Sequence, residues 1–95
     1  MMFHLKFHAF AEPDGDGGFV AKMPALPQVF APGDTAAEAI ANVEEVARLV
    51  LEVLIFNGEE IPADIPCENG TILEFQIDPK ALEGKTPDTL GEGAQ

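Results

Sequence analysis

The amino-acid sequence contains no serine, tyrosine or tryptophan, and its 95 residues include a single arginine and a single cysteine. A serine nucleophile is therefore excluded, and so is a cluster of arginines that grips phosphate. Only 5 lysines and arginines stand against 17 aspartates and glutamates, which gives a formal net charge of −12. Because affinity for nucleic acid comes largely from basic side chains that displace counterions, this balance argues against direct nucleic-acid binding. A basic protein partner is compatible with it.

The lone cysteine, Cys67, allows no disulfide within the chain, and the first residues lack the apolar run and cleavage site of a secretory leader. We therefore expect a cytoplasmic protein. The longest nearly apolar stretch, residues 49–56, is interrupted by Glu52, and a membrane span needs about 20 residues. The sequence therefore predicts no contact with a membrane. Its length and its 46% of hydrophobic residues are typical of one small folded domain.

Residues 2–10 and 71–77 alternate between apolar and polar side chains, as half-buried strands do. Residues 13–18 read Pro-Asp-Gly-Asp-Gly-Gly and predict a turn, after which residues 19–23 return to apolar side chains. Residues 2–23 are thus predicted to form a β-hairpin. The short segment 28–31 is flanked by prolines, which favours a third strand at a sheet edge or end.

Residues 36–56 have the periodicity of a helix. Thr35 and Glu38 have the spacing of a capping box, in which the hydroxyl accepts from a helix amide and the carboxylate reaches back to the threonine amide. Asn57 and Gly58 predict the end of the helix. One face is predicted to cover the core: Ala36, Ile40, Val43, Ala47, Val50, Leu51 and Leu54. The opposite face is largely charged: Glu38, Glu45, Arg48 and Glu52, with Arg48 placed to pair with Glu44 or Glu52.

The predicted order is therefore β-β-β-α-β, an α+β fold in which one long helix packs on a single sheet. We assign residues 1–78 to this domain. Residues 79–95 contain glycines, prolines and few apolar side chains, so we expect them to form a loose tail.

Three apolar side chains of the predicted helix, Leu49, Val53 and Phe56, fall on or near its outward face. A monomer that covers only one helix face would leave them in water. They are our candidate interface, either between copies of the chain or with another protein. The remaining interpretation is that a second layer of the same chain folds over them.

No pattern predicts a catalytic, cofactor or metal site. Asp14 and Asp16 begin like a calcium loop, but Gly18 and Ala25 stand where further ligands are needed, so a polar turn is expected. His4 and His8 are four residues apart on one strand, or about 13 Å, which is too far to share an ion. We therefore expect both to face solvent.

Cys67 has no basic neighbour in the sequence that would activate it as a nucleophile. The helix acids recur at every seventh residue and read as a solvated stripe rather than a hydrolase site. The sequence therefore points away from catalysis.

Three motifs resemble the N-terminal domain of HicB-type antitoxins. The family pattern is a hairpin ending in P-x-L-P-G, then G-D-T-x-x-E-A-x-x-N opening a helix, then G-x-x-I-P after it. The matching segments are residues 14–27, 33–45 and 57–62, and the resemblance spans about residues 7–77. Gln28 departs from it, because it stands where the family usually has glycine.

The resemblance implies a partial ribonuclease-H-like fold without nuclease activity. It also implies neutralisation of a small basic HicA-type toxin that cleaves mRNA. Many members continue into a helix-turn-helix or ribbon-helix-helix domain, for which residues 78–95 are too few, so a stand-alone domain without DNA binding is expected.

We therefore predict a non-catalytic antitoxin-type protein that forms a homo-oligomer, a dimer or a tetramer. Two other functions remain open. One is an orphan oligomeric protein with a structural or small-ligand-binding role, and the other is a metal-dependent hydrolase.

Overall fold

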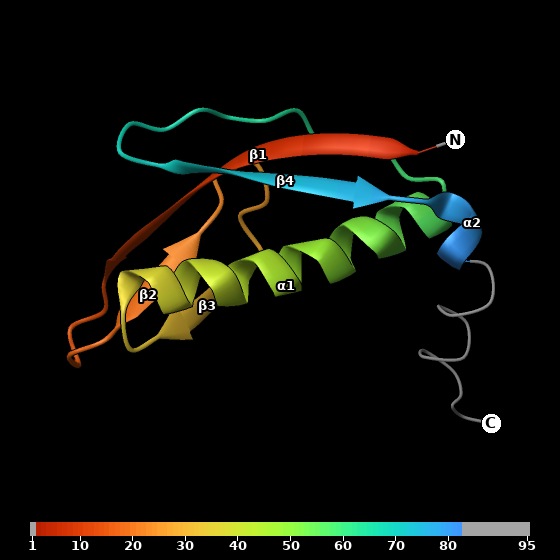
Figure 1. Ribbon diagram of the computed structural model, residues 1–95. Coiled ribbons are helices and arrows are strands. Elements are labelled where there is room, and N and C mark those ends of the chain that lie inside the picture. The colour runs from red at the N-terminus through yellow and green to blue at the C-terminus, as the bar shows by residue number, and fades with distance from the viewer. Residues whose placement is uncertain (1, 83–95) are drawn as a thin grey trace, which may run out of the picture.

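Four strands form one antiparallel sheet in the order β3-β2-β1-β4, and the long helix α1 lies on one face of it (Figure 1). The computed structural model describes residues 2–82. The elements are β1 (Phe3–Pro13), β2 (Phe19–Lys22), β3 (Phe30–Gly33), α1 (Ala36–Phe56), β4 (Thr71–Ile77) and the short helix α2 (Pro79–Leu82). The predicted α+β fold is confirmed. Of the predicted loose tail, residues 79–82 form the short helix α2 instead, and residues 83–95 lie outside the described residues. The domain boundary at residue 78 stays a prediction.

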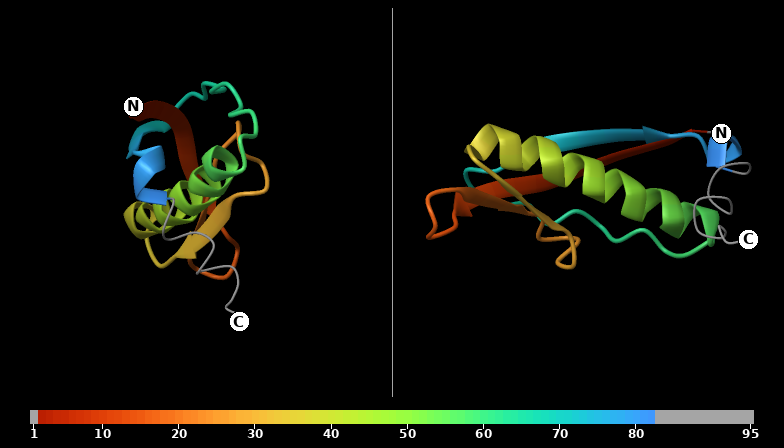
Figure 2. Two further views of the ribbon diagram at one scale, coloured as in Figure 1. Left: turned by 90° about the vertical axis from the view of Figure 1, so that its right-hand side faces the viewer. Right: turned by 90° about the horizontal axis from the view of Figure 1, so that it is seen from below.

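Strand β1 is shared between two partners along its length. Its first part pairs with β4, from Phe3 opposite Ile77 to Ala9 opposite Thr71. Its last part pairs with β2, from Phe10 opposite Lys22 to Pro13 opposite Phe19. β1 is therefore the strand that joins the β1-β4 pair to the β2-β3 pair. The two ends of α1 lie beside different strands of the sheet (Figure 2).

The two ends of α1 are fixed by the residues that the sequence marks out. The Glu38 amide donates to Thr35 Oγ1 at 3.1 Å, as expected for the first half of a capping box. The second half differs from the prediction, because Glu38 Oε1 accepts from the amide of Asp34, at 2.8 Å, and not from that of Thr35. At the other end Gly58 has a φ of 72°, in the left-handed region that favours glycine after a helix. The helix thus begins and ends where predicted.

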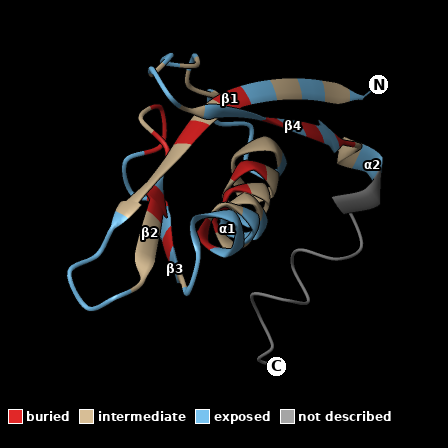
Figure 3. Ribbon diagram, turned by 60° about the vertical axis from the view of Figure 1, so that its left-hand side comes forward, coloured by how far each residue is buried: buried red, intermediate tan, exposed pale blue. Residues whose placement is uncertain are grey.

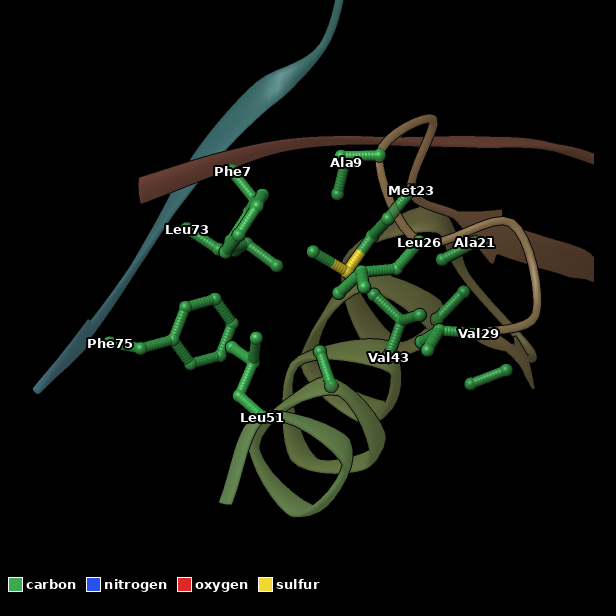
Figure 4. Close-up of a cluster of buried hydrophobic side chains, with 14 of the residues drawn as sticks. Phe7, Ala9, Ala21, Met23, Leu26, Val29, Val43, Leu51, Leu73 and Phe75 are labelled. Carbon is green, nitrogen blue, oxygen red and sulfur yellow. The ribbon is translucent and has the colours of Figure 1, made fainter. Parts of the chain in front are cut away.

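The core is a layer of side chains between the sheet and α1 (Figure 4). The helix contributes a buried residue at every fourth position: Ala39, Val43, Ala47 and Leu51. The sheet contributes alternate residues of its strands: Phe7, Ala9, Ala21, Ala31, Leu73, Phe75 and Ile77. Ala36 was predicted to belong to this face but is exposed. The buried face of α1 begins one turn later, at Ala39. Small alanines on the helix allow it to lie close to the sheet.

The segment between β2 and β3 was predicted as strand 28–31, but the strand begins two residues later, at Phe30. The preceding residues form two successive turns, in which the Leu26 amide donates to the Met23 carbonyl and the Val29 amide to the Leu26 carbonyl. Met23, Leu26 and Val29 are each only 1% exposed. The side chains of these turns are therefore part of the core. The prolines around them predict a break in regular structure and give no sign of this burial.

Side chains also reach the outer edges of the sheet. Asn42 of α1 donates from Nδ2 to the carbonyl of Pro32 on β3, at 2.8 Å. Arg48 of α1 donates from Nη1 to the carbonyl of Gln76 on β4, at 3.3 Å. Both contacts link the helix to the two strands at the edges of the sheet, β3 and β4.

Neither α1 nor α2 combines the length and the apolar composition that a membrane crossing requires.

Candidate interaction surface

Helix α1 carries a second apolar strip on one flank, beside the face that packs on the sheet. We call Val46, Leu49, Val53 and Phe56 the helix stripe. Their spacing of three, four and three residues places them on neighbouring turns of one side of the helix. Leu49 is 63% exposed and Phe56 41%. Along the helix axis the stripe extends for about 15 Å.

A shallow groove accompanies the helix stripe. It has a volume of about 260 Å³, and its lining consists of four aliphatic side chains: Leu49, Val50, Val53 and Leu54. Val50 and Leu54 also pack against the core, which holds the floor of the groove in place. The groove is open to solvent rather than enclosed, so it suits a protruding side chain of another protein better than a small molecule.

Acidic side chains border the helix stripe. Glu45 and Glu52 lie beside it on the same helix, and Glu59 and Glu60 follow the helix end. Arg48 does not neutralise them. Its guanidinium lies 5.7 Å from the centre of the Phe75 ring and bonds to the Gln76 carbonyl. The predicted pairing of Arg48 with Glu44 or Glu52 is therefore replaced by contacts with β4. The apolar surface therefore has an acidic border. Arg48, the basic residue of α1, contacts β4 instead of this border.

The two histidines of β1 differ in environment. His4 is exposed, as predicted, but His8 is half-buried because the segment after α1 passes beside it. Asp64 Oδ2 lies 2.6 Å from His8 Nδ1, and Asp64 Oδ1 accepts from the His8 amide at 2.8 Å. Burial alone would raise the pKa of Asp64, but these hydrogen bonds from His8 hold that pKa below its usual value. The prediction that His8 simply faces solvent is therefore wrong.

The aspartates of the hairpin turn lie near the start of α1. Asp14, Asp16, Asp34, Glu38 and Asn42 line an open depression of about 350 Å³. Within residues 2–82, no three histidine, cysteine or acidic side chains are grouped so that they could hold a metal ion. Gly15 and Gly17 adopt positive φ, and the Asp14 amide donates to the Gly18 carbonyl at 2.9 Å. This segment is a tight polar turn, as its sequence predicts.

Cys67 is a free, half-buried thiol in the segment before β4. It lies next to Gly70, where any side chain would collide with its sulfur and with the Ala9 carbonyl. Cys67 therefore lies where this segment approaches β1 closely.

Asp64 is a residue that the sequence does not predict to be important. Its partner His8 is 56 residues away in the chain, and no motif joins the two.

Several known proteins are similar to this chain in sequence. A UPF0150 protein of Thermoplasma acidophilum is 38% identical over 60 residues, which are 63% of this chain and 87% of the relative. A UPF0150 protein of Synechocystis is 38% identical over 53 residues, which are 56% of this chain and 67% of the relative. An uncharacterised 14.9 kDa protein of Haemophilus phage HP1 is 35% identical over 54% of this chain and 38% of its own length. A scan against models of protein families finds no match.

Solved structures give the same answer for the fold. The N-terminal domain of the Burkholderia pseudomallei antitoxin HicB aligns with a TM-score of 0.57 at 21% identity, over 78% of this chain and 99% of that domain. The longer HicB structure from the same organism aligns with a TM-score of 0.56 at 21% identity, over 86% of this chain and 70% of that one. The resemblance that the motifs predict is confirmed. The chain belongs to the UPF0150 family, and its fold is that of the N-terminal domain of HicB antitoxins.

Proposed function

We propose that this protein acts as a non-catalytic antitoxin-type protein that binds a small basic partner through the helix stripe. The observation that carries the proposal is an exposed apolar stripe with an acidic border on a chain of net charge −12. A HicA-type mRNA-cleaving toxin, which the sequence motifs imply, has the required basic character. The likeness of the fold to the HicB N-terminal domain supports the proposal. We place this encounter in the cytoplasm, where Cys67 would stay a free thiol.

The stripe offers two separate contributions to binding. Burial of one exposed leucine or phenylalanine contributes about 1.5–3 kcal/mol, so Leu49 and Phe56 act as anchors of the contact. The acidic border contributes mainly to the rate and the selectivity of association, because it attracts a basic surface and repels an acidic one. The complementary surface on the partner is therefore a row of apolar side chains flanked by lysine or arginine.

The proposal does not include binding to an operator. Within residues 2–82 the chain has one long helix, α1, and the four-residue α2. A helix-turn-helix needs two packed helices of useful length. Lys6, Lys22, Arg48 and Lys80 are the only lysines and arginines in this part of the chain, too few for a phosphate-binding surface.

The experiment is co-expression of the protein with the tagged product of a neighbouring small basic reading frame, followed by affinity measurement. Leu49→Asp should weaken binding by about 100-fold or more, because it places a carboxylate in an apolar contact. Phe30→Asp is the matched control, since Phe30 is 61% exposed on the opposite side of the sheet, and it should bind the partner as the wild type does.

Salt provides an independent measurement. Binding that depends on the acidic border should weaken between about 0.05 M and 0.5 M NaCl as the charges are screened. If no basic neighbour binds, or if Leu49→Asp binds with wild-type affinity, the proposed function is wrong.

A further inference from the structure

The face of the sheet opposite α1 is largely open, with the segment after α1 passing beside His8 on it. The strand register points these side chains away from the helix: His4, Lys6, His8, Phe10 and Glu12 of β1, Val20 and Lys22 of β2, Phe30 and Pro32 of β3, and Ile72, Glu74 and Gln76 of β4. None of them is buried (Figure 3). A sheet that packs on one face only leaves the other to water or to another molecule.

The charge of this outer face differs from that of the rest of the molecule. Its acidic residues are Glu12 and Glu74, and its lysines are Lys6 and Lys22. Lys22 Nζ lies 2.7 Å from Glu12 Oε2, and Lys6 lies opposite Glu74 in the register of β1 and β4. The outer face is therefore balanced in charge, whereas the chain as a whole carries −12.

Apolar side chains on the same face surround one of these ion pairs. Phe10, Lys22 and Phe30 lie in one row across three strands, and Val20 and Pro32 lie in another row together with Glu12. We call Phe10, Val20, Phe30 and Pro32 the outer patch. Phe30, at 61% exposure, is its most prominent member. An exposed apolar patch around a neutral ion pair has the character of a protein contact surface.

We propose that the outer patch is the contact between two copies of this chain, stacked sheet against sheet. Two molecules of net charge −12 repel each other over most of their surface, so they associate best through a face that is neutral. The outer patch satisfies this requirement, and a two-fold axis that runs in the plane of the contact, midway between Lys22 and Glu12, would place Lys22 of one copy over Glu12 of the other.

The helix stripe fits a second copy less well. Its border of Glu45, Glu52, Glu59 and Glu60 would face the same acidic border across a two-fold axis. The outer patch lies on the face of the sheet that points away from α1, whereas the helix stripe lies on α1 itself. A dimer formed through the outer patch therefore leaves both stripes accessible, and this proposal stands independently of the proposed function.

The test is the oligomeric state of the full chain by sedimentation velocity at about 0.1 mM protein, at about 0.05 M and 0.5 M NaCl. We expect a dimer whose population rises with salt, because screening removes repulsion between like-charged copies. This direction is opposite to that expected for binding of a basic partner. A wild-type monomer at both salt concentrations overturns the proposal.

Two variants locate the contact. Phe30→Asp should raise the dimer dissociation constant at least tenfold, and Lys22→Glu should do so without removing any apolar residue. Leu49→Asp is the control and should dimerise as the wild type does. If Leu49→Asp dissociates the dimer, or if both outer-face variants keep it, the contact lies elsewhere. Partner binding by Phe30→Asp is read separately, so loss of the dimer does not bear on the proposed antitoxin role.

Discussion

Replacement of Gly33 by alanine should destabilise the protein more than the same replacement at any other glycine that the structure describes. Gly33 ends β3 directly beneath the first turns of α1. A β-carbon at this position would overlap the Ala39 nitrogen and lie 2.8 Å from the Ala39 Cα and 2.9 Å from the Glu38 carbonyl carbon. All three atoms belong to the helix backbone. Because no side-chain rotation relieves the overlap, the helix must move away from the sheet.

The magnitude follows from two opposing effects. Overpacking costs about 1–3 kcal/mol, and the upper end applies here because the obstacle is backbone. Alanine also restricts the unfolded chain more than glycine does, and this effect stabilises the folded state by about 0.4–1 kcal/mol. The net loss in the free energy of unfolding is about 2 kcal/mol. A domain of this size has a total stability of roughly 5–14 kcal/mol, so the change is a substantial fraction.

Urea denaturation followed by far-ultraviolet circular dichroism measures this loss. Gly17→Ala is the matched control: no atom lies within 4 Å of the added carbon, and only the φ of 97° disfavours alanine. That strain costs about 1 kcal/mol, part of which the unfolded-state effect offsets. The reasoning is refuted if Gly33→Ala unfolds within about 0.5 kcal/mol of the wild type, or if Gly17→Ala is the less stable of the two.

Three further changes test the core, the helix cap and the contact between Asp64 and His8. Leu51→Ala should cost about 2–5 kcal/mol in chemical denaturation, because Leu51 is 0% exposed and its loss leaves a cavity; a loss below 1 kcal/mol would contradict the packing described. Thr35→Ala should cost about 1 kcal/mol through loss of the hydrogen bond to the Glu38 amide, whereas Thr71→Ala, on an exposed strand position, should cost less. Asp64→Asn should lower the free energy of unfolding at pH 7. The folded pKa of Asp64 lies below its ordinary value near 3.8, so the carboxylate stabilises the fold above that pH, and this contribution disappears as pH falls through the folded pKa. Denaturation of wild type and variant at pH 7 and at about pH 2 should therefore show a difference that closes in acid; a constant difference would contradict it.

The parts of the fold that the sequence predicts are those fixed by local chemistry. Thr35, Glu38 and Gly58 define the ends of α1 by bonds within a few residues, so the predicted range of 36–56 matches the structure. The strand at 71–77 is predicted equally well, because the alternation of Leu73, Phe75 and Ile77 corresponds to one buried face.

The parts that the sequence does not predict depend on residues far apart in the chain. Asp64 approaches His8 only after the segment that follows α1 has folded back beside β1, so neither residue carries a local signal. The buried turns around Leu26 were hidden because proline reads as a break in regular structure, and a break need not be exposed. The candidate interface of Leu49, Val53 and Phe56 stays a prediction, although Leu49 and Phe56 are exposed as expected. Its acidic border could not be judged from the sequence, because the contacts of Arg48 with β4 appear only in the fold.

The hydrogen bonds at the margins of the sheet have a consequence for how this protein behaves when it is crowded. An unpaired strand edge is a template on which another chain can add a strand and start a fibre. Here Asn42 bonds the Pro32 carbonyl on β3, Arg48 bonds the Gln76 carbonyl on β4, and Asp64 bonds the His8 amide on β1. A strand that approaches any of these edges must first break a bond and leave a polar group without a partner. The three side chains, Asn42, Arg48 and Asp64, therefore oppose the addition of a foreign strand at these positions, and with it the growth of an open-ended fibre from the edges of this sheet.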